Sequence, residues 1–274
     1  MTAISDVSLG PVELSVAEAG RGGRPLLLVH GFTGAKEDFA DWMDALATDG
    51  WWVVAPDLRG HGASAKPPAE ADYSLAIFAD DLLALVDDLG WGSFALLGHS
   101  MGGAVAEEAA LRVPDRIDKL VLMDTHHGAW EGLDPASVER GAEVIRTDGL
   151  AALLEIIDAF AGERSEADQR VRDTRPGYVD WSQSKLDAAS PEMYASLGVE
   201  LHVRADRLAE LASFPAPTLL IVGEQDDDFL VRAARRMAAA MPDATLAVIA
   251  DAAHSPQFEN PDAWWSTLQA FLLS

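Results

Sequence analysis

A serine in a glycine-rich turn is the feature that most constrains the fold of this chain. The turn is Gly98-His99-Ser100-Met101-Gly102, a G-x-S-x-G sequence. The apolar run Phe94-Ala95-Leu96-Leu97 before it is typical of a buried strand, and the alanine-rich residues 103–111 after it are typical of a helix. In this context the pattern indicates a nucleophile elbow, a sharp turn that exposes the serine hydroxyl. The pattern therefore predicts a reactive Ser100 where a strand turns into a helix.

A serine hydroxyl is a weak nucleophile at neutral pH, so it needs a base that is itself oriented by an acid. His254 follows the strand predicted at 246–249, and Asp226 follows the strand predicted at 218–222. Ligands of open α/β sheets bind beyond the carboxyl ends of the strands, which is where both residues are expected. We expect His254 to be the base and Asp226 the acid. Asp124, at the end of the strand predicted at 120–123, is a rival acid.

The other six histidines have positions that suit a base less well. His30 and His61 lie in polar turns and are expected to shape loops, while His99 is expected to point away from Ser100. His126 and His127 follow a strand, so they could either line a pocket or lie exposed at the surface. His202 lies in a predicted helix and has no visible partner.

An oxyanion hole needs two N–H donors aimed at the charge that develops on the substrate. Met101 supplies one of them, because it follows Ser100 at the start of a helix, where backbone N–H groups are unpaired. The second is expected from Phe32 in the loop His30-Gly31-Phe32-Thr33-Gly34, whose glycines let the backbone approach a substrate closely.

Five motifs in one order resemble the α/β-hydrolase fold superfamily, and they extend over nearly the whole chain. The resemblance implies a mostly parallel eight-stranded sheet flanked by helices, a Ser100–His254–Asp226 triad, and an oxyanion hole formed by Phe32 and Met101. The motifs are His30-Gly31-Phe32-Thr33-Gly34, Pro56-Asp57-Leu58-Arg59-Gly60-His61-Gly62-Ala63-Ser64, Gly98-His99-Ser100-Met101-Gly102-Gly103, Gly223-Glu224-Gln225-Asp226, and His254-Ser255-Pro256 with Glu259-Asn260-Pro261.

The distribution of apolar residues predicts a core interrupted by an insertion. Strands and helices alternate up to residue 124 after an initial hairpin, in the rhythm of a parallel α/β sheet. From 125 to 213 only helical patterns occur, and the alternation then resumes. We therefore expect an α/β core from 1–124 and 214–274, with a helical cap at 125–213.

Composition narrows the range of partners and locations. The formal net charge of −25 argues against nucleic acid and anionic membrane surfaces as partners, since both would be repelled. The chain has no cysteine, which excludes disulfides and thiol catalysis. No signal-peptide pattern and no apolar run of membrane-spanning length is visible. We expect a cytoplasmic monomer or homodimer that acts on a small molecule and needs no metal or cofactor.

The cap gives weaker signals about the substrate. Its aromatic and apolar side chains suit either a pocket over Ser100 or the core of the cap itself, and its arginines suit either surface ion pairs or an inward-facing carboxylate site. We expect a neutral, mostly apolar acyl pocket. Pocket candidates are Trp130, Phe160, Tyr178, Trp181, Met193, Tyr194 and, beyond the cap, Phe229.

The motifs together predict a serine hydrolase that cleaves a carboxylic ester or lactone through an acyl-enzyme. The same triad also suits two other reactions, that of a lyase of the menaquinone-pathway type and that of the C–C bond hydrolases of aromatic degradation. A non-catalytic small-molecule receptor on the hydrolase fold is a further alternative.

Overall fold

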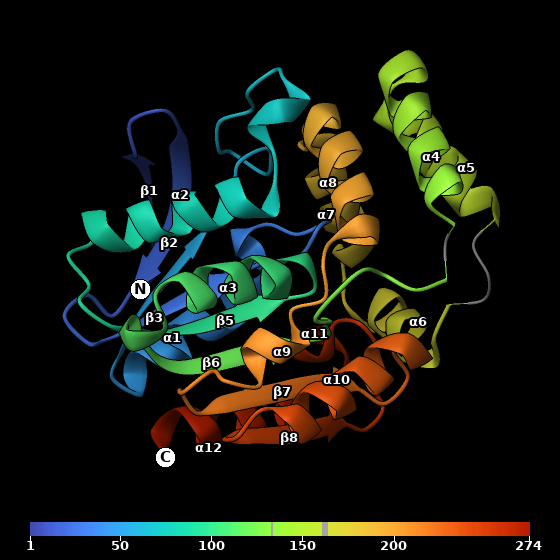
Figure 1. The fold of residues 1–274 in the computed structure, drawn as a ribbon. Helices are drawn as coiled ribbons and strands as arrows, with labels where there is room; N and C mark the ends of the chain where they lie inside the picture. The colour runs from blue at the N-terminus through green and yellow to red at the C-terminus, as the bar shows by residue number, and fades with distance from the viewer. Residues whose placement is uncertain (133, 161–163) are drawn as a thin grey trace.

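A sheet of eight strands runs through the described part of the chain (Figure 1), which in the computed structural model comprises residues 1–132, 134–160 and 164–274. The order in space is β1-β2-β4-β3-β5-β6-β7-β8. β2 pairs antiparallel with both β1 and β4, and all the other pairs are parallel, so the predicted mostly parallel sheet is confirmed. The strands are β1 (Ala3–Ser8), β2 (Glu13–Ala19), β3 (Arg24–Val29), β4 (Trp51–Pro56), β5 (Phe94–His99), β6 (Ile117–Met123), β7 (Thr218–Gly223) and β8 (Ala244–Ile249).

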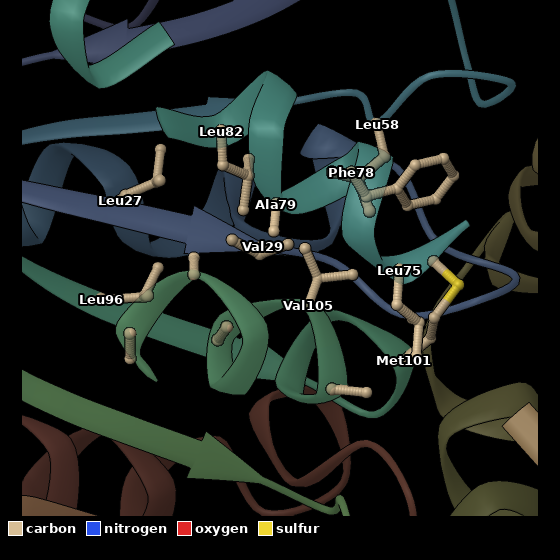
Figure 2. Close-up of a cluster of buried hydrophobic side chains, with 14 of the residues drawn as sticks. Leu27, Val29, Leu58, Leu75, Phe78, Ala79, Leu82, Leu96, Met101 and Val105 are labelled. Atoms are coloured by element: carbon tan, nitrogen blue, oxygen red, sulfur yellow. The ribbon is translucent and has the colours of Figure 1, made fainter. Parts of the chain in front are cut away.

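Helices cover both faces of this sheet. Successive side chains of a strand point to opposite faces, so a strand buried on both sides is apolar throughout. Leu27 and Val29 of β3 face α2 (Leu75–Asp88) and α3 (Met101–Arg112), as Figure 2 shows. Leu26 and Leu28 lie in the opposite core with α1 (Ala40–Thr48) and α12 (Pro261–Leu273). The other elements of the core are the 3₁₀ helices η1 (Lys36–Phe39), η2 (Glu70–Asp72) and η3 (Pro114–Arg116) and the α-helices α10 (Asp228–Ala240) and α11 (Pro256–Glu259).

Between β6 and β7 the described residues form helices and no strand. α4 packs against α5 and α8, and Figure 1 shows α4 and α5 on the outer side of α8. None of the helices in the described ranges is both long and apolar enough to cross a membrane. The helices of this insertion are α4 (Pro135–Asp148), α5 (Leu150–Phe160), α6 (Glu166–Thr174), α7 (Tyr178–Asp187), α8 (Pro191–Val203) and α9 (Leu208–Leu211).

Two of the ion pairs that connect the insertion to the core involve a buried core carboxylate. Lys185 Nζ lies 2.6 Å from Asp38 Oδ1, and Arg204 pairs with Glu107, whose side chain is fully buried on α3. Burial raises the pKa of Glu107 to about 7, although the charge and hydrogen bond of Arg204 oppose the rise. The insertion is therefore held by charged groups as well as by apolar contacts.

The turn from β5 into α3 brings two stretches of backbone into direct contact. Ser100 has φ 54° and ψ −119°, a conformation that non-glycine residues rarely adopt. A β-carbon on Gly98 would lie 2.2 Å from the carbonyl oxygen of Gly102. A β-carbon on Gly102 would lie 2.4 Å from the carbonyl oxygens of Val29 and His30. Glycine is required at both positions, because the atoms that a β-carbon would meet belong to the backbone and cannot move aside as a side chain could.

Replacing Gly102 with alanine should destabilise the fold. The added methyl group must displace the backbone at the end of β3, so the free energy of unfolding should fall by about 2 kcal/mol or more. Gly92→Ala is the matched control, since a β-carbon there meets no atom within 4 Å. Urea unfolding followed by circular dichroism measures both variants. Equal stabilities for the two would contradict the backbone contact described here.

Candidate active site

Three side chains from separate parts of the chain meet at the carboxyl edge of the sheet. Ser100 follows β5, Asp226 follows β7, and His254 lies in the loop between β8 and α11. His254 Nε2 lies 2.9 Å from Ser100 Oγ, and its Nδ1 lies 3.0 and 3.2 Å from the two carboxylate oxygens of Asp226. The structure thus brings together the three residues that the motifs predict. It places Asp226, and not its rival Asp124, against the imidazole.

The electrostatics of the pair suit a histidine that accepts a proton. Desolvation opposes protonation of His254, but the charge and hydrogen bond of Asp226 outweigh it and raise the pKa of the imidazole. Burial opposes ionisation of Asp226, yet the neighbouring His254 lowers the pKa of its carboxyl. Asp227 lies beside this pair and accepts a hydrogen bond from the N–H of Phe229 at 2.7 Å, so it caps α10.

Two backbone N–H groups near Ser100 are available for an oxyanion. Those of Phe32 and Met101 donate to no acceptor within the described residues. The Phe32 loop is held from behind by His61, whose Nε2 lies 2.9 Å from the Phe32 carbonyl oxygen. His30 Nε2 accepts the N–H of Leu58 at 3.0 Å. His30 and His61 therefore shape loops, as expected.

Two residues to which the sequence analysis gave no role in the site support the loop carrying His254. Glu259 Oε2 accepts the N–H of Ala253 at 2.6 Å and that of Ser255 at 3.0 Å. His99 Nε2 lies 2.6 Å from the His254 carbonyl oxygen, with which it pairs as donor. Burial, followed by the charge of His254, lowers the pKa of His99 to about 3, so its ring is neutral. His99 was expected to point away from Ser100, and its ring lies beside that of His254, with centroids 5.2 Å apart.

A cavity of about 630 Å³ opens above Ser100 between the core and the insertion. Its apolar wall is formed largely by Phe32, Trp130, Tyr178, Leu186 and Phe258. Trp130 and Tyr178 are residues that the sequence proposed for the pocket. The cavity is lined by residues of the loop that carries Phe32 and of the loop that carries His254. A bound molecule therefore has direct access to Ser100 and His254.

Four charged side chains line the same cavity, and they occur as two ion pairs. Lys185 Nζ lies 2.6 Å from Asp38 Oδ1, and Arg172 Nε lies 2.8 Å from Asp168 Oδ2. The expected mostly apolar pocket therefore contains charges, but each cation is matched by a carboxylate.

Three aromatic residues expected in the pocket lie outside its wall. Trp181 does not line the cavity, and its ring centroid lies 3.8 Å from the Lys185 ammonium nitrogen. Tyr194 is buried behind Phe32, with ring centroids 4.3 Å apart. Phe229, in the first turn of α10, is buried beside Trp130 and lines a second, smaller cavity. Packing between elements decides these positions, which helical periodicity alone does not reveal.

The remaining pocket candidates and histidines are also accounted for. Met193 is fully buried against Gly60, and the side chain of Phe160 lies outside the described residues. His126 and His127 line a separate cavity of about 270 Å³, and His202 lines the larger one. No cluster of three or more potential metal ligands occurs in the described ranges.

The pairing of Asp226 with His254 predicts a specific change in titration. Asp226→Asn should lower the pKa of His254, because the neutral amide no longer stabilises the imidazolium. Nuclear magnetic resonance titration of the His254 ring measures the shift, with the exposed Asp228→Asn as control. An unchanged pKa in Asp226→Asn would mean that another carboxylate, such as Glu259, supplies the stabilising charge.

Comparison with known proteins agrees with this architecture. The chain is 29% identical over 263 residues to the dihydrolipoyllysine-residue acetyltransferase component of the acetoin cleaving system of Cupriavidus necator, covering 95% of this chain and 67% of that protein. It is 28% identical over 276 residues to 2-(acetamidomethylene)succinate hydrolase of Mesorhizobium japonicum, covering 97% and 94%. The enol-lactonase structure from Burkholderia xenovorans matches with a TM-score of 0.84 and 26% identity, covering 98% of this chain and all of that one. The family model for the alpha/beta hydrolase fold matches residues 24–261, so the chain belongs to the α/β-hydrolase family.

Proposed function

We propose that this protein hydrolyses a carboxylic ester or lactone of a small molecule. The observation that carries the proposal is the unbroken series of hydrogen-bond contacts from Ser100 through His254 to Asp226 at the base of a cavity. In this reading Ser100 is the nucleophile, His254 the base and Asp226 the group that orients it.

The reaction takes place in two stages. His254 Nε2 takes the proton of Ser100 as Oγ attacks the carbonyl carbon, and the π electrons of that carbonyl move to its oxygen. Collapse of the tetrahedral intermediate breaks the bond to the leaving alkoxide, which receives the proton from His254. Water then gives a proton to His254 and attacks the acyl group, and collapse releases the acid as the proton returns to Ser100.

The loops around Ser100 would provide the charge stabilisation that this chemistry needs. The N–H groups of Phe32 and Met101 would donate to the oxyanion, since both are unpaired within the described chain. Residues 125–213 would form a cap that completes the cavity over a core of 1–124 and 214–274. The members of this cap that contribute apolar side chains to the cavity wall are Trp130, Tyr178, Leu186 and Leu201.

The comparisons support the reaction class and leave the acyl acceptor open. One similar protein is named as an enol-lactonase and another as a hydrolase, whereas a third is named as an acetyltransferase component. Water as the acceptor is the reading that accords with two of the three names. Turnover of p-nitrophenyl esters of graded chain length, beside an enol-lactone, tests ester and lactone hydrolysis directly.

Ser100→Ala should abolish turnover while leaving the fold intact. Loss of a triad nucleophile lowers kcat by about 10⁴-fold or more. Ser182→Ala is the matched control, because Ser182 lines the same cavity but has no contact with His254 in the hydrogen-bond pattern. A fluorophosphonate should label Ser100, as peptide mass mapping would show. Undiminished turnover in Ser100→Ala, or labelling elsewhere, would contradict the mechanism.

The paired charges in the cavity predict a preference for neutral substrates. Arg172 and Lys185 are each matched by a carboxylate, so little positive charge remains to offset the field of a chain with net charge −25. Short neutral esters should therefore exceed their ω-carboxylate analogues in kcat/KM by about tenfold, or ~1.4 kcal/mol of transition-state binding.

The same comparison of kcat/KM values would also reveal the opposite preference, for the ω-carboxylate analogues. A preference for the carboxylate analogue that disappears in Arg172→Ala would show that this arginine leaves Asp168 to bind the substrate. Arg164→Ala is the control, since Arg164 approaches the same carboxylate at 3.6 Å but does not line the cavity.

A further inference from the structure

Asp124 is a buried carboxyl group beside the candidate triad that the reaction above does not use. It follows β6 directly, has φ 47°, and is 1% exposed. Its N–H donates to the Ile221 carbonyl oxygen at 2.8 Å, and its Oδ1 accepts the N–H of Gly223 at 2.8 Å. Both main chain and side chain thus tie Asp124 to the end of β7, three residues before Asp226.

The second oxygen of Asp124 lacks a donor. Oδ2 is buried, and no hydrogen-bond donor of the described chain reaches it. Asp226 is joined to the same glycine, because its N–H donates to the Gly223 carbonyl oxygen at 3.3 Å, and each of the two carboxyl groups shifts the pKa of the other. Two ionised carboxylates only accept hydrogen bonds, so a bond between these groups requires that one of them carries a proton.

The surroundings determine which of the two holds that proton. Asp226 faces His254 and also accepts the N–H of Asp227 at 2.8 Å, and both contacts stabilise its charge. Two acidic groups, Asp226 and Glu259, act on Asp124 and oppose its ionisation. Burial, reinforced by the charge of Asp226, raises the pKa of Asp124 well above its usual value. Of the two carboxyl groups, Asp124 is therefore the one whose surroundings favour a bound proton.

We propose that Asp124 is a positioning residue that donates a hydrogen bond from a protonated Oδ2 to the Asp226 carboxylate. The bond would hold Asp226 in the orientation in which both of its oxygens lie near His254 Nδ1. It would also share the negative charge of Asp226 and thereby moderate how strongly His254 holds a proton. The role in turnover rests on the proposed function, whereas the shared proton does not.

The proton itself can be observed without any substrate. An infrared difference spectrum of the wild-type protein minus Asp124→Asn at pH 7 should contain the C=O stretch of a protonated carboxylic acid, and ¹³C labelling of aspartate should shift it. Asp228→Asn, which alters an exposed carboxylate, should give no such band. Absence of the band from the Asp124 difference spectrum would overturn the proposal.

Kinetics test whether the bond positions Asp226. Asn at 124 keeps an N–H donor for Asp226 and an oxygen for the Gly223 N–H, whereas Ala keeps neither. Hydrogen bonds to charged groups are strong enough that Asp124→Ala should lose about tenfold or more in kcat relative to Asp124→Asn, with a smaller change in KM. The acid limb of the kcat/KM profile should move to higher pH in Asp124→Ala, because an unshared Asp226 charge raises the pKa of His254.

Three results separate the possible failures. If Asp124→Asn is as damaging as Asp124→Ala and the acid limb stays in place, the positioning role is overturned. If Asp124→Ala does not fold, the infrared band decides whether the shared proton exists, and an Asp124→Asn variant with activity as low as Asp226→Asn would still overturn the role. If the wild-type protein cleaves no ester or lactone, the proposed function fails while the infrared band still tests the shared proton.

Discussion

The arrangement of the site depends on the close contact between the first turn of α3 and the ends of β3 and β5. Gly98 and Gly102 let the helix start against the backbone of both strands. This contact determines the direction of α3, and with it the place where Ser100 and the Met101 N–H stand. The end of β3 continues into the loop that carries Phe32, so the same contact also sets the distance between the N–H groups of Phe32 and Met101, the two proposed oxyanion donors.

Parallel strands then deliver the remaining groups to one edge. β6, β7 and β8 follow β5 in the sheet order, so the loops after them bring Asp124, Asp226 and His254 to the same edge of the sheet as Ser100. Each loop is held by buried polar contacts of its own, such as those of Glu259 with the Ala253 and Ser255 N–H groups. Buried polar groups that are satisfied in this way limit the number of conformations a loop can adopt. The site is therefore organised before any substrate arrives.

Much of this arrangement could be predicted because its signals are local. The G-x-S-x-G turn, the apolar strands and the polar residues after them give the sheet and the positions of Ser100 and His254. Asp124 and Asp226 both follow strands, and only the packing of those loops shows which of them meets the imidazole. Trp181, Tyr194 and Phe229 were assigned to the pocket by residue type, but the face that each one presents depends on neighbouring helices. The supporting contacts of His99 and Glu259 cross between elements, and no periodicity encodes them.

The paired charges around the cavity also affect the end of a catalytic cycle. If ester hydrolysis is the reaction, its acid product is an anion at neutral pH, formed inside a protein with net charge −25. Arg172 and Lys185 already have carboxylate partners, so neither cation has its full charge available to retain that anion. Repulsion from the surrounding field then favours departure of the product. The acidity of the chain would thereby make the release step easier and keep inhibition by accumulated acid weak.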